Sequence, residues 1–180
     1  MEQSFKIINF ENIASTSEKA KELVAENFEP WTVVVSKEQS SGHGRKGEGW
    51  FSPVGGLYFS VILPKTNIDD LQTITNLTAF VIAQTLKNDF NLQPLIKLPN
   101  DILLQEKKVA GILTENIIIG QNPVFSIIGI GLNTNIDNFP EELKDKATSL
   151  KIELNQEIDN NQILEEILIG LKKQLEIISQ

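Results

Sequence analysis

Three apolar segments that follow one another in the second half of the chain limit its fold most strongly. They are a short run at 101–105 (DILLQ), then 108–119 (KVAGILTENIII) and 124–133 (VFSIIGIGLN). Turn-forming residues separate them, first Lys107-Lys108 and then the group 120–123 (GQNP). Consecutive strands joined by turns rather than by helices predict a sheet whose strands are mostly antiparallel.

Further strands and helices are predicted around these segments. TVVVS at 32–36 and LYFSVIL at 57–63 are typical of buried strands, and the capping pattern at 15–18 opens a helix to about Asn27. Apolar residues recur at helical spacing over 69–90. A last helix is marked by Ile163, Ile167, Leu168, Leu171 and Leu175. We therefore predict an α+β fold, with a mixed, mostly antiparallel β-sheet and helices packed on one face.

Length and composition exclude several classes of function. The 180 residues are enough for one domain, which we expect to span 1–180. The net charge of −8 disfavours binding to nucleic acid or to an anionic membrane. The chain has no cysteine, which excludes thiolate chemistry and fits a reducing compartment. There is no signal peptide and no apolar stretch of about 18 residues, so we expect a cytoplasmic protein.

Three glycines in the segment SSGHGRKGEGWFSPVGG have the spacing G-x-G-x-x-G, and they are Gly42, Gly44 and Gly47. A dinucleotide fingerprint needs a helix directly after them, but Pro53 and further glycines follow instead. The Walker pattern also fails, since no Gly-Lys-Ser/Thr is present. What remains is a loop that brings its backbone close to a ligand and presents Arg45 and Lys46. It indicates an anionic small molecule, and a solvated hairpin loop with incidental charge is the alternative.

A second polar cluster lies in KLPNDILLQEKKVAGIL at 97–113. A Pro-Asn-Asp corner ends one element, and Lys107 and Lys108 lead into an apolar strand. Because neighbours in a strand point to opposite faces, one lysine can face a site while the other meets solvent. The alternative is a plain hairpin with solvated lysines.

Together these motifs resemble those of the biotin–protein ligases. The family pattern Gln-x-x-Gly-[Arg/His]-Gly-Arg-x-Gly-x-x-Trp-x-Ser-Pro-x-Gly-Gly-Leu-Tyr is matched at 39–58. Lys-Trp-Pro-Asn-Asp is matched with one change at 97–101, Lys-x-Ala-Gly-Ile-Leu at 108–113 and Gly-x-Gly-x-Asn at 129–133. The resemblance covers 15 to about 150 and implies the class II synthetase-like catalytic fold shared by biotin and lipoate ligases. It also implies activation of biotin with ATP to biotinyl-5′-AMP and transfer to a lysine of a biotin carboxyl carrier protein.

The resemblance implies which residues bind biotin. Hydroxyl and amide side chains match those that hold the ureido ring, and they suit a urea because they both donate and accept hydrogen bonds. For Ser15, a helix N-cap completed by Glu18 is an alternative role that can coexist with this one. The implied biotin contacts are Ser15, Thr16, Gln39, Gly42, His43, Arg45, Lys108 and Gly111.

The resemblance also implies how two anions are brought together. Arg45 matches the arginine whose loop closes over the mixed anhydride, and Lys108 the lysine that holds the biotin carboxylate against the α-phosphate. Asp101 matches the base or orienter for the attacking carrier lysine, which must lose a proton. The implied ATP contacts are Arg45, Lys46, Trp50, Lys97, Asn100, Lys108, Gly131 and Asn133.

Some of these ATP roles have alternatives. Trp50 matches the aromatic that packs against adenine, and a tryptophan folded back onto the core is the alternative. Asn133 matches the asparagine that reads the adenine edge, and a turn residue at a strand end is the alternative. Lys97 and Asn100 are implied to help with phosphate or its Mg²⁺, whose ligands the sequence does not specify.

The chain departs from the family pattern at several points. Ser17 replaces an asparagine, and Leu98 replaces a tryptophan, which removes an aromatic from the wall of the biotin pocket. We expect neither an N-terminal DNA-binding domain nor the usual C-terminal SH3-like domain, and we expect homodimers paired through sheet edges. Two alternative functions stay open, a lipoate or octanoate ligase or transferase of the same fold and a biotin-binding domain with reduced transfer activity.

Overall fold

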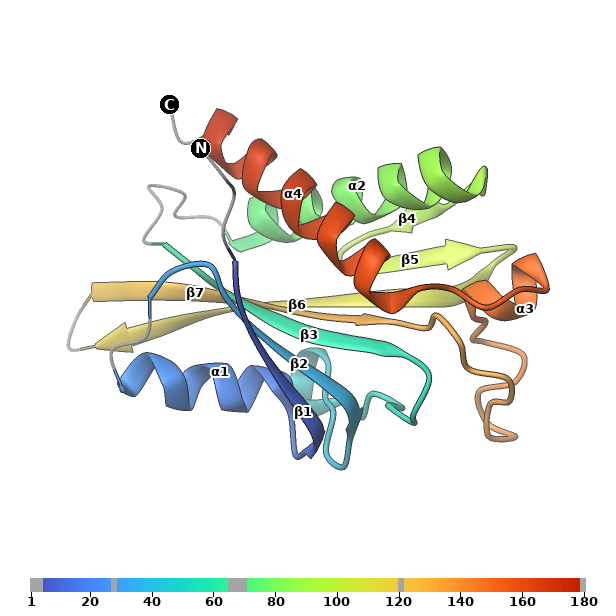
Figure 1. Cartoon of the computed structure of the whole chain (residues 1–180), viewed down its shortest axis with the longest axis horizontal. Coiled ribbons are helices and arrows are strands. Elements are labelled where there is room, and N and C mark those ends of the chain that lie inside the picture. Colours follow the sequence, from blue (N-terminus) through green and yellow to red (C-terminus); the bar gives the residue numbers. More distant parts are fainter. Residues whose placement is uncertain (1–4, 27–28, 65–70, 120–121, 179–180) are drawn as a thin grey trace.

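The computed structural model describes residues 5–26, 29–64, 71–119 and 122–178. Its centre is a seven-stranded sheet in the order β1-β2-β3-β7-β6-β5-β4 (Figure 1). The strands are β1 (Lys6–Ile13), β2 (Thr32–Gln39), β3 (Leu57–Leu63), β4 (Leu95–Lys97), β5 (Asp101–Leu104), β6 (Lys107–Ile119) and β7 (Asn122–Leu132). Strands β1 and β2 pair in parallel, and every other neighbouring pair is antiparallel. The prediction of a mixed, mostly antiparallel sheet is confirmed.

Helices cover both faces of this sheet. Figure 1 shows α1 (Thr16–Ala25) on one face and α2 (Leu71–Phe90) and α4 (Asn160–Ile178) on the other; α3 (Leu150–Leu154) lies beyond the sheet. The prediction that helices pack on one face is therefore wrong. Its physical reason lies in β3, where every residue is buried: Phe59 packs toward α2 and α4, while Ile62 packs toward α1. A strand whose residues are all buried needs other elements packed on both sides of the sheet.

Most elements follow the sequence pattern, and the differences have local causes. Strand β3 has the predicted bounds, but β1, β4 and α3 were not predicted. The turn predicted at Lys107-Lys108 lies instead at Gln105 and Glu106, whose φ angles are 47° and 68°. Three further predictions, the end of the first helix at about Asn27, the helix start at 69–70 and part of the turn at 120–123, fall outside the described residues.

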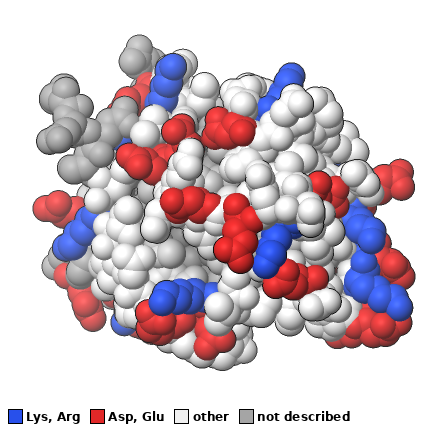
Figure 2. Space-filling view, turned by 45° about the vertical axis from the view of Figure 1, so that its right-hand side comes forward, with Lys and Arg blue, Asp and Glu red and all other residues white. Residues whose placement is uncertain are grey.

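The surface reflects the acidic composition. On the face shown in Figure 2, acidic side chains are spread widely and basic ones lie between them. None of the helices in the described part of the chain combines the length and the hydropathy that crossing a bilayer requires.

The burial of α2 generates a stability prediction. The side chain of Ile82 is fully buried between the sheet and α4, whereas that of Phe80 on the same helix is 46% exposed. We expect Ile82→Ala to lower the free energy of unfolding by about 2–5 kcal/mol, because it leaves a cavity in the core. Phe80→Ala serves as the control and should cost less than about 1 kcal/mol. Urea denaturation measures both, and equal losses would contradict the packing described.

Candidate active site

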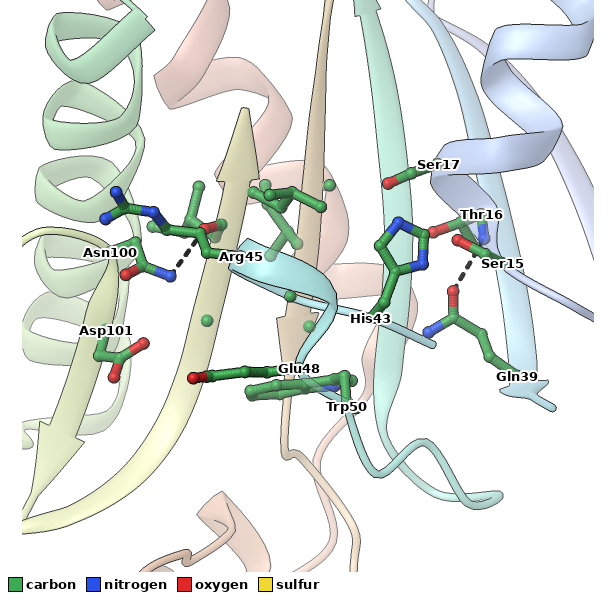
Figure 3. Close-up of a pocket in the computed structure, with 18 of the residues that line it drawn as sticks. Ser15, Thr16, Ser17, Gln39, His43, Arg45, Glu48, Trp50, Asn100 and Asp101 are labelled. Carbon is green, nitrogen blue, oxygen red and sulfur yellow. Dashed lines mark hydrogen bonds between the residues drawn. The ribbon is translucent and has the colours of Figure 1, made fainter. Parts of the chain in front are cut away.

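A cavity lies where the start of α1, the loop after β2, the first half of β6 and the end of β7 meet (Figure 3). The cavity is partly open to solvent and brings several polar side chains together, as small-molecule sites usually do. Its lining consists of Ser15, Thr16, Ser17, Gln39, His43, Gly44, Arg45, Glu48, Gly49, Trp50, Asn100, Asp101, Lys108, Gly111, Ile112, Leu113, Gly129, Ile130 and Gly131.

One end of the cavity is built from hydroxyl and amide groups. Ser15 caps α1 by accepting a hydrogen bond from the Glu18 N–H at 3.5 Å, which confirms the predicted cap. Thr16 follows, and its N–H donates to Gln39 Oε1 at 2.8 Å. Gln39 Nε2 donates to Ser52 Oγ at 2.9 Å, so both ends of this amide are fixed. The helix start and the loop after β2 are thereby held together.

The glycine-containing loop folds into a tight hairpin. The Gly44 N–H donates to the Glu48 carbonyl at 2.7 Å, and the Trp50 N–H donates to the Gly42 carbonyl at 2.8 Å. A single 3₁₀ turn, η1 (Arg45–Gly47), forms its tip. No longer helix follows the glycines, in agreement with the rejection of a dinucleotide fingerprint.

Tyr58 anchors the chain that returns from this loop. Its hydroxyl donates to the Pro53 carbonyl at 2.8 Å. Burial raises the pKa of the Tyr58 hydroxyl, an effect that a backbone hydrogen bond at Gly56 partly offsets. The hydroxyl therefore remains protonated near neutral pH and keeps its donor role.

The Trp50 side chain lies on two glycines of the sheet. Gly111 in β6 and Gly131 in β7 are register partners. A Cβ atom at Gly111 would lie 2.8 Å from Trp50 Cζ3, and one at Gly131 would overlap with Trp50 Nε1. Only glycine at both positions allows the indole to approach the sheet this closely.

The other end of the cavity carries charge. Lys108 Nζ lies 2.7 Å from Asp101 Oδ1 and 5.0 Å from the centre of the Trp50 ring. Asn100 Nδ2 donates to the Ile112 carbonyl at 3.1 Å, and Figure 3 shows Arg45 pointing toward Asn100. Lys107 Nζ bonds instead to the Lys144 carbonyl at 3.1 Å, outside the cavity lining. The predicted opposition of the two lysines is confirmed.

A group of charged side chains joins α1 to β6 near the polar end. Lys21 Nζ bonds to Glu18 at 2.8 Å and to Glu115 at 3.0 Å. Burial lowers the pKa of the Lys21 ammonium, but its hydrogen bonds to these carboxylates outweigh this and leave the pKa above its usual value. His43 Nε2 lies 3.6 Å from Glu18 Oε1. The group could hold a metal ion by distance alone, but the Lys21 ammonium already bonds to both carboxylates.

Four of the residues predicted to contact biotin or ATP do not line the cavity. Gly42 lies behind it, against Gln39 and Ser52. Lys46 lines a neighbouring cavity that Arg45 and Asn100 share. Lys97 is exposed on the edge strand β4.

Asn133 is the fourth of these residues, and it is 3% exposed. Its Nδ2 donates to the Lys108 carbonyl at 3.4 Å and to the Thr148 carbonyl at 3.0 Å. Its Oδ1 has no partner in the described chain, so the adenine contact stays a prediction that rests on this oxygen.

The remaining residues predicted to contact biotin or ATP line the cavity. The prediction for Leu98, in contrast, needs a correction. Leu98 was expected in the pocket wall but is 68% exposed and absent from the described lining. The Leu98 side chain lies on the surface, so the change from tryptophan removes nothing from this wall. Sequence reasoning missed Ser17 and Glu48, which line the cavity, and Ser52, which bonds to Gln39. Ser17 stands directly after the predicted Ser15-Thr16 pair, and its position in the first turn of a helix could have identified it.

Solved structures of known function share this fold. A biotin protein ligase from Aquifex aeolicus in complex with biotin and ATP superimposes with a TM-score of 0.87 at 32% identity, over 97% of this chain and 72% of that one. Lipoate-bound LipL1 of P. falciparum superimposes with a TM-score of 0.55 at 16% identity, over 97% of this chain and 45% of that one. The second likeness concerns the fold alone.

Sequence comparison identifies the family. Residues 10–133 match the model of the biotin/lipoate A/B protein ligase family. The bifunctional ligase/repressor BirA of Bacillus spizizenii is 39% identical over 165 residues, which are 89% of this chain and 51% of that protein. The chain belongs to the biotin/lipoate A/B protein ligase family, and it spans about half the length of the curated BirA relatives from Bacillus that it matches.

The contact of the Trp50 indole with Gly111 and Gly131 generates a second prediction. We expect Gly131→Ala to displace the indole, shift the tryptophan emission to longer wavelength and destabilise the fold by about 1–3 kcal/mol through overpacking. Gly49→Ala in the same loop is the control, since no atom lies within 4 Å of its added Cβ. Fluorescence and thermal melting report both effects. An unchanged spectrum in Gly131→Ala would mean that Trp50 does not lie on the sheet.

Proposed function

We propose that the chain activates biotin with ATP to biotinyl-5′-AMP and then transfers the biotinyl group to a lysine of a biotin carboxyl carrier protein. One observation carries this proposal: the cavity has hydroxyl and amide groups at one end and Lys108 with Arg45 at the other. Biotin has the same division, since a ureido ring and a carboxylate lie at its two ends. ATP completes the charged end as the second anion.

In the first step, a biotin carboxylate oxygen attacks the α-phosphorus of ATP. The P–O bond to the leaving pyrophosphate breaks as the new O–P bond forms. Lys108 and Arg45 offset the repulsion between the two anions, and cations fixed beforehand need no reorganisation as the charge moves. The ion pair with Asp101 and the contact with the Trp50 ring support Lys108 in this position.

In the second step, the neutral amine of the carrier lysine attacks the biotinyl carbonyl carbon, and AMP leaves with the electrons of the broken C–O bond. Asp101 accepts the proton that the amine must lose, or orients the amine for this loss. The Asp101 side chain lines the cavity and is 25% exposed.

The oxygen atoms near Lys108 fit a Mg²⁺ ion bound with the ATP phosphates. Asn100 uses its Nδ2 in a bond to Ile112, so its Oδ1 is free in the described chain, and Asp101 adds a carboxylate. One or two oxygen ligands from the protein are usual for Mg²⁺ that also binds phosphate. The ion would neutralise charge on the leaving pyrophosphate.

Two considerations favour biotin over lipoate. The curated relative at 39% identity is named as a BirA ligase, while the lipoate-bound structure shares 16% identity. A dithiolane ring would also leave the hydroxyl hydrogen of Thr16 without an acceptor, which costs free energy in a buried site. We further propose a cytoplasmic location, where ATP is available, and dimers that pair through sheet edges.

The decisive test is biotin-dependent exchange of labelled pyrophosphate into ATP by the purified chain. We expect exchange with biotin and Mg²⁺, and none above background when lipoate or octanoate replaces biotin. Exchange with lipoate alone would establish the alternative ligase. Biotin binding without any exchange would establish a binding domain instead of an enzyme.

The two neighbouring lysines give a matched pair of variants. Lys108→Ala should slow adenylate formation by about 10²–10³-fold, as is typical when one preorganised donor to a developing charge is lost. Lys107→Ala should change the rate by less than about threefold, because its ammonium lies outside the cavity. Single-turnover measurement of adenylate on folded variants compares them. Greater sensitivity at Lys107 would refute the assignment.

A further inference from the structure

Three buried hydroxyl groups form a chain behind the polar end of the cavity. Ser60 Oγ in β3 donates to Thr16 Oγ1 at 2.8 Å, and Ser17 Oγ lies 3.1 Å from Ser60 Oγ. The exposed fractions of Thr16, Ser17 and Ser60 are 4%, 5% and 0%. Sequence reasoning assigned no role to Ser60, and its hydroxyl has no place in the reaction steps above.

The number of hydrogens fixes the direction of this chain. Each hydroxyl carries one hydrogen. Since Ser60 gives its hydrogen to Thr16, the bond between Ser17 and Ser60 uses the hydrogen of Ser17. The hydrogens therefore run from Ser17 to Ser60 and from Ser60 to Thr16.

Thr16 is left with its own hydroxyl hydrogen. In the described part of the chain, no acceptor takes this hydrogen, and Thr16 lines the cavity. The Thr16 N–H is already bound to Gln39 Oε1 at 2.8 Å. The hydroxyl is thus the donor that Thr16 can offer to a ligand.

We propose that Ser17 and Ser60 are positioning residues that hold Thr16 as a hydrogen-bond donor, so that the cavity selects a carbonyl oxygen at this point. The inference rests on the proposed function, in which this oxygen belongs to the biotin ureido group. An isolated threonine hydroxyl can turn to donate or to accept. Here the hydrogen of Ser60 already occupies one of the free directions around Thr16 Oγ1. A Thr16 hydroxyl that accepts from the ligand must therefore break this buried bond or turn its own hydrogen to the remaining direction, where it has no acceptor among the described residues.

The selection works against ligands that present a donor. A cyclic guanidine of the same shape as biotin has an N–H group where biotin has its carbonyl oxygen. That N–H would face the Thr16 hydrogen, and two opposed donors disfavour binding. The relay, by which we mean the hydroxyl groups of Ser17, Ser60 and Thr16, therefore contributes specificity as well as affinity.

The sheet leaves space for the relay at Gly129 in β7. A Cβ atom there would lie 2.5 Å from Ser17 Oγ and 3.6 Å from Ser60 Oγ. Glycine at this position allows the Ser17 hydroxyl to reach Ser60.

The test compares biotin with 2-iminobiotin, its cyclic guanidine analogue, by titration calorimetry on the full chain without ATP. Ser60→Ala should weaken biotin about tenfold, the size expected for one oriented hydrogen bond, and change iminobiotin by less than about threefold. The affinity ratio, which is the affinity for biotin divided by the affinity for 2-iminobiotin, should therefore fall. Ser17→Ala should lower it less, since the bond from Ser60 to Thr16 remains. In adenylate formation, the KM for biotin should rise while kcat stays unchanged.

Ser36→Ala is the matched control. Ser36 is 2% exposed in the neighbouring strand β2, its hydroxyl donates to the Glu38 carbonyl at 2.6 Å, and it lies outside the cavity lining. Its affinity ratio should equal that of the parent. Equal weakening of both ligands by Ser60→Ala, or the same change in Ser36→Ala, would overturn the relay. If Ser60→Ala does not fold, Ser17→Ala takes its place, and an unchanged affinity ratio in that variant would overturn the relay.

The outcomes also separate the relay from the proposed function. A parent chain that binds no biotin would overturn the proposed function and the relay with it. A parent that binds biotin and makes the adenylate, with an unchanged ratio in both variants, would overturn the relay alone.

Discussion

The contact of Trp50 with two paired glycines is the constraint on which the rest of the site depends. Gly111 and Gly131 face each other across β6 and β7, and the indole fills the space that side chains there would occupy. This contact ties the loop to the sheet and determines where Arg45 at the loop tip can lie. The same ring lies 5.0 Å from the Lys108 ammonium, so one contact organises both cations.

The polar end is held by a different kind of interaction. Hydrogen bonds join the start of α1 to Gln39 at the end of β2 and to Ser60 in β3. Each bond runs between segments that are far apart in sequence, so the hydroxyl and amide groups exist as a set only in the folded chain. Because each hydroxyl has a single hydrogen, the directions of the hydrogen bonds between the hydroxyl groups are fixed, and this end of the cavity is specific for the hydrogen-bonding groups of a ligand. The other end acts on a ligand through charge.

The sequence predicts the fold best where burial is complete. LYFSVIL predicted β3 with its bounds, because a nearly continuous apolar run that is short and rich in β-branched and aromatic residues favours a buried strand over a helix. The same run also implied cover on both faces, which the prediction of helices on one face overlooked. In β1 the apolar residues Ile8, Phe10 and Ile13 stand among polar ones and are at most partly buried, and β4 has only three residues, so the apolar signal of both strands is weak. Motif spacing identified most of the cavity lining, but Leu98 and Asn133 show that spacing does not determine where a side chain points.

An acidic chain can bind an anionic nucleotide because electrostatic interactions in salt water are short-ranged. At physiological ionic strength the Debye length is about 8 Å, so the net charge of −8 acts weakly on a small ligand inside the cavity. Lys108 and Arg45 line that cavity, and Arg45 has no ion pair among the described residues. A nucleic acid contacts a wide surface and meets the many carboxylates there. The composition therefore argues against a polyanion partner without opposing ATP.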